Sequence, residues 1–124
     1  MDTSASLKGR ARSKNLTLAR WEAQDAALRQ RLARTGWISE GYVQNRGPGA
    51  GGPCYQWTRK IKGQTVSVAL SQEQFEWLGG AIAEWRQVQA TLKQMQRLSR
   101  QVLFETVIHP PRRKRLGKKV LGLM

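Results

Sequence analysis

The glycine-rich stretch NRGPGAGGPCYQW, residues 45–57, has the composition of a ligand-binding loop. A phosphate-binding loop joins a strand to a helix and carries Lys and then Ser or Thr after its last glycine, because backbone amides, the helix dipole and the lysine hold the phosphate. Here Pro53 and Cys54 follow the last glycine, and the residues after them alternate as in a strand. We therefore expect a hairpin connection between two strands and no nucleotide site.

Cys54 and His109 are the only cysteine and the only histidine of the chain, and they lie 55 positions apart. A structural zinc ion needs about four ligands, and a nucleophilic cysteine needs a nearby histidine and an orienting acid. The acidic residues of the long helix predicted below do not have metal-site spacing. We expect no metal, no cofactor, no small-molecule substrate and no catalytic residue, so that the chain is not an enzyme and Cys54 is a small buried residue.

The charge of the chain is strongly positive and unevenly distributed. Its 22 Lys and Arg against 8 Asp and Glu give a net charge of +14. Residues 1–36 carry +5, residues 37–71 carry +3 and residues 110–124 carry +6, whereas residues 72–109 are neutral. A surface made only for solubility mixes both signs. This segregation is instead typical of a polyanion-binding protein whose neutral segment packs or dimerises.

The N-terminal part of the chain predicts one helix behind a flexible arm. Apolar residues recur at three-, four- and seven-residue steps over residues 16–35, as in an amphipathic helix. Thr17 is the expected N-cap, and Gly36 is the expected left-handed residue that ends the helix. Residues 1–15 are rich in Ser, Lys and Arg and have no apolar period, so we expect a basic disordered arm.

From Trp37 the apolar period changes to two, which predicts a small antiparallel sheet within residues 41–70. The expected strands are residues 41–46, 54–61 and 64–70. Lys62-Gly63 separates the last two strands and predicts a two-residue hairpin turn, because glycine tolerates the positive φ that such turns demand.

The sequence SQEQ, which opens with Ser71 and has Gln74 three positions later, is a capping box and predicts the start of a helix. Apolar residues at three- and four-residue steps extend that helix over residues 72–107, before two prolines stop it. Such a helix is roughly 50 Å long, far longer than a three-stranded sheet is wide. Its distal half therefore needs another partner, which is either the first helix folding back or a second copy of the chain.

These elements together predict an α+β fold with one domain over residues 16–109 and a basic disordered tail over residues 110–124. The neutral long helix is the expected partner or dimer interface. The interface residues that we expect are Trp85, Leu92, Met95 and Val102.

The strand pattern places Gln56, Thr58 and Lys60 on one face of the sheet, opposite the aromatic residues. A two-stranded ribbon fits the major groove of B-DNA, and such polar and basic side chains contact phosphates and base edges. An ordinary solvated face is equally polar, and the basic ends favour nucleic acid. Trp57 lies on the other face, where burial against the long helix is favoured over stacking on a base. The expected nucleic-acid contacts are Arg10, Arg12, Lys14, Arg46, Gln56, Thr58, Arg59, Lys60, Lys62, Arg112, Arg113, Lys114, Arg115, Lys118 and Lys119.

The segment GYVQNR, the following GPCYQWTRKIKGQTVSVALSQEQFEWL and the long helix resemble a family of small basic bacterial domains of unknown function, whose members often occur beside transposases and other mobile-element genes. The resemblance covers residues 41–106 and implies an association with mobile DNA. Family members commonly carry a Cys-Gly-Lys-Pro-x-Cys-x-Cys cluster where this chain has only GPGAG, so any zinc site of the family is absent here. The matching positions are Gly52, Pro53, Tyr55, Trp57, Thr58, Arg59, Lys60, Gly63, Val66, Val68, Leu70, Ser71 and Gln74.

We therefore predict a non-enzymatic accessory protein, associated with a mobile element, that binds DNA or RNA through its basic arms and a polar sheet face. The alternative is a protein-interaction module whose long neutral helix dimerises or docks on a transposase-like or ribonucleoprotein partner. No apolar run reaches the ~18 residues of a membrane span, no apolar leader opens the chain, and a single cysteine forms no internal disulfide. These features predict a cytoplasmic protein that does not contact a membrane.

Overall fold

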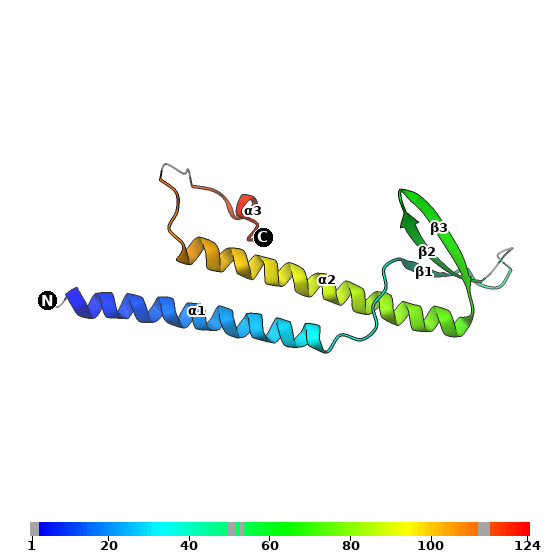
Figure 1. Cartoon of the computed structure of the whole chain (residues 1–124), viewed down its shortest axis with the longest axis horizontal. Coiled ribbons are helices and arrows are strands. Elements are labelled where there is room, and N and C mark those ends of the chain that lie inside the picture. The colour runs from blue at the N-terminus through cyan, green and yellow to red at the C-terminus, as the bar shows by residue number, and fades with distance from the viewer. Residues whose placement is uncertain (1–2, 50–51, 53, 112–114) are drawn as a thin grey trace. The chain divides into compact units, whose positions relative to one another are not determined.

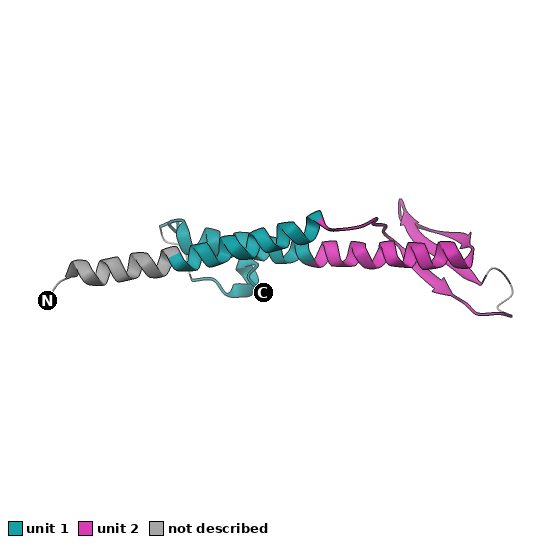
Figure 2. Ribbon diagram, turned by 90° about the horizontal axis from the view of Figure 1, so that it is seen from below, with its two compact units in different colours: residues 1–33, 91–124 teal, residues 34–90 magenta. Residues whose placement is uncertain are grey.

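The computed structural model describes residues 3–49, 52, 54–111 and 115–124, with side chains from residue 16 onward. The chain has the predicted α+β fold (Figure 1). Two compact units divide it, a helical unit of residues 1–33 and 91–124 and a sheet unit of residues 34–90 (Figure 2). The elements are α1 (Thr3–Ala33), β1 (Tyr42–Asn45), β2 (Tyr55–Ile61), β3 (Gln64–Leu70), α2 (Gln72–Thr106) and α3 (Lys118–Leu121).

The sheet unit contains a three-stranded antiparallel sheet in the order β1-β2-β3, as predicted. Trp57 in the central strand lies opposite Val43 of β1 and Val68 of β3, so these three apolar residues share one face. The turn between β2 and β3 has positive φ at both central residues, +49° at Lys62 and +80° at Gly63. Positive φ at both positions belongs to the type I′ turn that matches the twist of a hairpin.

The apolar sheet face packs against the first turns of α2. The rings of Tyr55 and Phe75 lie with their centroids 4.8 Å apart. The Val43 side chain approaches α2 at Gly79, where an added Cβ atom would lie 3.7 Å from Val43 Cγ2. One turn further along, Ile82 is buried. The sheet and α2 therefore share one small core within this unit.

The segment before β1 is fixed to the sheet through Trp57. The indole Nε1–H of Trp57 donates a hydrogen bond to the carbonyl oxygen of Glu40 over 3.1 Å. Gly41 follows with a φ of +109°, and a Cβ atom there would overlap the Trp57 indole. Only glycine fits this position, because the backbone conformation is left-handed and the indole occupies the side-chain space.

The end of α1 differs from the prediction. The helix ends at Ala33 rather than at residue 35, and Gly36 is not among the residues with positive φ, so it is no left-handed cap. Instead the Gly36 N–H donates a hydrogen bond to the Glu84 carboxylate over 3.3 Å. The Ser39 N–H donates to the Ala81 carbonyl over 3.2 Å. These two hydrogen bonds fix the segment of residues 36–39 to α2 within the sheet unit.

The start of α1 also differs from the prediction. The helix begins at Thr3 and passes through Thr17, which is therefore not its N-cap. Helix was predicted only from residue 16 because no apolar period precedes it. Residues 3–15 contain no proline and a single glycine, Gly9, so nothing in their sequence stops the helix from extending.

The capping box at the start of α2 is present as predicted. The Ser71 Oγ accepts a hydrogen bond from the Gln74 N–H over 3.1 Å, and the Gln74 side-chain oxygen accepts one from the Ser71 N–H over 2.9 Å. Two backbone amides at the helix start are thereby satisfied.

In the helical unit, α1 lies beside the C-terminal half of α2 (Figures 1 and 2). Leu28 of α1 and Leu98 of α2 are buried, and Thr91 is only 2% exposed. The distal half of the long helix thus packs on α1, which was one of its two expected partners.

The C-terminal tip of the helical unit folds into the short helix α3, within the tail that we expected to be disordered. Gly122 caps it with a φ of +71°, and the Leu123 N–H donates to the Lys118 carbonyl over 2.9 Å. Arg100 of α2 donates from Nη1 to the Gly122 carbonyl over 3.2 Å. Glycine suits this closure because the cap position is left-handed.

Candidate nucleic-acid interface

The polar face of the sheet gathers the side chains that the sequence assigned to it. Thr58 lies opposite Tyr42 of β1 and Ser67 of β3, and Lys60 lies opposite Thr65. The hydroxyl oxygens of Thr58 and Ser67 are 3.1 Å apart and share a hydrogen bond. Every sheet–helix contact given above lies on the other face. This face therefore offers hydroxyl, amide and ammonium groups in a flat array, which suits contacts to phosphates or base edges.

Gln56 belongs to the same array, because it lies opposite Gln44 of β1 and Ala69 of β3. Gln56 is half-buried, whereas Lys60 is exposed. Lys62 is exposed in the turn beyond Lys60 and extends the basic character to that end of the sheet.

Arg59 lies on the opposite, apolar face. Its guanidinium carbon lies 4.7 Å from the Trp57 ring centroid, which is cation–π geometry. Its Nε is buried and has no hydrogen-bond partner among the described residues. Trp57 itself is half-buried and hydrogen-bonded to Glu40, so this tryptophan is a packing residue and Arg59 covers it.

Arg46 follows β1 on the glycine-rich loop. Its backbone N–H donates to the Cys54 carbonyl over 2.7 Å, which closes the loop between β1 and β2. The Arg46 side chain is exposed, and Cys54 is a half-buried free thiol. Residues 50, 51 and 53 of this loop lie outside the described residues.

The positive charge is concentrated in the helical unit. Its residues 1–33 and 91–124 include 16 Lys and Arg against 4 Asp and Glu, a net charge of +12. Residues 34–90 of the sheet unit include 6 against 4, a net charge of +2. The sequence shows only that the positive charge lies in separate segments. The packing of α1 on the C-terminal half of α2 brings the basic segments into one compact unit.

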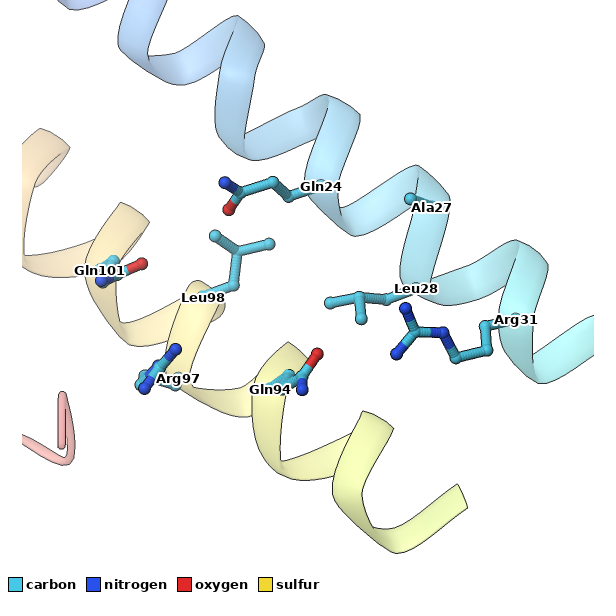
Figure 3. A pocket seen from close by; sticks show the side chains of 8 residues that line it. All are labelled: Gln24, Ala27, Leu28, Arg31, Gln94, Arg97, Leu98 and Gln101. Atoms are coloured by element: carbon cyan, nitrogen blue, oxygen red, sulfur yellow. The ribbon is translucent and has the colours of Figure 1, made fainter. Parts of the chain in front are cut away.

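A groove with a volume of about 390 Å³ lies between α1 and α2 in this unit (Figure 3). Arg31 comes from α1 and Arg97 from α2, and the side chains of Leu28 and Leu98 extend between the two helices. None of the described side chains that line the groove is acidic. Guanidinium groups form paired hydrogen bonds to phosphate oxygens, and amide groups add further donors. The remaining lining residues are Gln24, Ala27, Gln94 and Gln101.

Sequence reasoning missed these groove residues. Gln94, Arg97 and Gln101 follow one another at steps of three and four positions and so share one face of α2. The same spacing relates Gln24 to Arg31 through Leu28 on α1. The sequence signal for this groove is the spacing of polar residues three and four positions from a leucine on both helices.

A neighbouring cavity of about 290 Å³ adds further basic side chains of α2. Lys93 and Arg100 line it together with Arg97, and Gly122 and Met124 of the C-terminal tip complete it. The basic side chains therefore extend from the groove around α2 to the tip.

The predicted basic contacts of the two ends belong to this same unit. Arg115, Lys118 and Lys119 are exposed. The Arg10, Arg12 and Lys14 side chains and residues Arg112, Arg113 and Lys114 lie outside the described residues.

The expected interface residues of α2 fall in both units. Trp85 is half-buried in the sheet unit. In the helical unit Met95 and Val102 are half-buried, whereas Leu92 is exposed.

Among the residues that the structure describes, no three His, Cys, Asp or Glu side chains come together as a metal-binding group. Over the same part of the chain, no helix has the length and apolar character that crossing a membrane requires. Comparison of the chain with family models, with curated proteins and with solved structures gives no match.

Proposed function

We propose that this chain is a non-enzymatic nucleic-acid-binding protein in which the helical unit supplies most of the affinity. The observation that carries the proposal is the net charge of +12 on that unit, together with a groove lined by two arginines and no acid. Phosphate backbones carry a dense negative charge with condensed counterions, and basic side chains bind them by releasing those ions.

In this proposal the sheet unit contacts base edges and adds few contacts to phosphates. Its polar face carries Gln56, Thr58 and Lys60 on a nearly neutral body. Such a face adds few phosphate contacts, and its amide and hydroxyl groups suit base edges. The resemblance to domains found beside transposases adds the proposal that the nucleic acid belongs to a mobile element.

Salt titration of binding tests the proposal. We expect fluorescence anisotropy with duplex DNA, single-stranded DNA and RNA to give an affinity that falls steeply with salt, with a log–log slope of about −0.9 per neutralised phosphate of a duplex. Replacing Arg31 and Arg97 together with alanine should make the slope less negative by about two such steps. Arg86→Ala serves as the control for the loss of one guanidinium outside the groove, because Arg86 lies on α2 in the sheet unit and is exposed.

Two results contradict the proposal. One is the absence of binding to every probe at low salt. The other is a slope that the groove variant leaves unchanged while Arg86→Ala alters it, which would move the phosphate contacts out of the helical unit.

A further inference from the structure

The outer strand β3 is an edge of the sheet without the usual protection. Its only strand partner among the described residues is β2. The sequence QTVSVAL contains no charge and no proline, and every residue from 64 to 69 is exposed. Natural edge strands are usually kept from pairing by Lys, Pro, bulges or shortness. This strand has seven residues and none of these devices, so its outer backbone groups are free to accept another strand.

An exposed apolar cluster lies beside this edge. Trp77 is 60% exposed, Val68 43% and Val66 37%. Trp77 and Val68 line an open cavity of about 490 Å³ together with Trp57, Leu70 and Leu78, and Glu73 and Gln74 of α2 complete its lining. Any strand that pairs with β3 will place alternate side chains against this cluster, because successive residues of a strand point to opposite faces.

We propose that the occupant is β3 of a second copy of the chain, paired antiparallel about Ser67. A two-fold axis at Ser67, the central residue of the strand, pairs all seven residues and keeps both apolar faces on the same side. Val66 then lies opposite Val68 of the second copy, and Gln64 lies opposite Leu70. Val66 of each copy fills the space beside Val68 and Trp77 of the other.

The charges at the strand ends favour a second copy. β3 itself is uncharged, so two copies of this positive chain meet here without repulsion between the strands. The same register brings the turn with Lys62 next to the start of α2 in the other copy, where Glu73 lies in the first helical turn. This pairing occurs twice by symmetry, and opposite charges at the ends of paired strands stabilise the register.

The mass of the full chain in solution tests this proposal independently of any nucleic acid. Light scattering and sedimentation of nuclease-treated protein at high salt should give a dimer, with twice the monomer mass of 14.0 kDa. Val66→Asp and Val68→Asp should each raise the dimer dissociation constant by about a hundredfold, because each places a carboxylate in the apolar cluster, where Glu73 is already negative. Ala69→Asp is the matched control, since it adds the same charge to the same strand on the polar face, opposite Gln56, and should leave the dimer intact.

A cross-link tests the register without relying on a destabilising change. In a Cys54→Ser background, Ser67→Cys should form an intermolecular disulfide on mild oxidation, because the axis places residue 67 opposite itself at roughly 5 Å between Cα atoms. Thr65→Cys should not, because its two copies lie about 13 Å apart in this register. A monomer at all concentrations overturns the proposal. A dimer that tolerates both aspartate variants while their circular dichroism is native also overturns it, as does a cross-link at residue 65 in place of 67.

Discussion

At the scale of single residues, glycines with positive φ differ in whether a neighbouring group also occupies the space of a side chain. Gly41 has a φ of +109° and faces the indole of Trp57. Gly47 has a φ of +77° and has no atom within 4 Å of a built Cβ. Both were glycines of the predicted strand and loop. The sequence could indicate that a glycine was needed near the first strand, but the overlap with Trp57 depends on strand register.

We expect Gly41→Ala to lower the free energy of unfolding by about 2–4 kcal/mol, because strain in the backbone adds to displacement of the indole from Glu40. Gly47→Ala should cost only about 1 kcal/mol, since it carries the backbone strain alone. Urea unfolding followed by tryptophan fluorescence measures both values. Equal losses in the two variants would show that Trp57 does not pack against position 41.

At the scale of elements, local signals located β2, β3 and α2 within one or two residues of their observed bounds. The Lys62-Gly63 turn and the Ser71 capping box are contained within a few neighbouring residues, so the sequence carries the whole of each signal. α1 was predicted too short because its first half has no apolar face. Periodicity detects a helix only through such a face.

We expect Ser71→Ala to destabilise the protein by about 1 kcal/mol, because the Gln74 amide loses its acceptor and the capping box is broken. Ser99→Ala is a suitable control, because the Ser99 hydroxyl only donates to the Met95 carbonyl within the helix. That change should be neutral or slightly stabilising. Thermal unfolding by circular dichroism distinguishes the two, and a tolerated Ser71→Ala would mean that the observed cap contributes little.

At the scale of the whole molecule, the proposals assign nucleic-acid affinity to the helical unit and pairing with a second copy to the sheet unit. The helical unit holds a net charge of +12, whereas the sheet unit holds +2 and the exposed β3 edge. If two copies pair through β3, their polar faces continue across six strands, and each dimer carries two basic helical units. Binding to nucleic acid would then gain from two linked sites on one polymer.

We expect deletion of residues 110–124 to make the salt slope of binding clearly less negative, because the deletion removes six basic residues and no acid. Lys60→Ala should change the slope by at most about one phosphate step, since it removes a single charge from the sheet. The same anisotropy titrations measure both. A larger effect from Lys60 than from the deletion would place the main phosphate contacts on the sheet.

The sequence by itself determined what short-range interactions encode: the α+β class, the hairpin turn, the helix cap, the polar sheet face and the excess of positive charge. Only the tertiary structure decided which distant segments of the chain pack together in one compact unit. Arg31 and Arg97 line one groove because α1 packs on α2, and Val68 lies beside exposed Trp77 because the sheet packs on the start of the same helix. These juxtapositions depend on contacts between residues far apart in the chain, and no local period or turn signal specifies them.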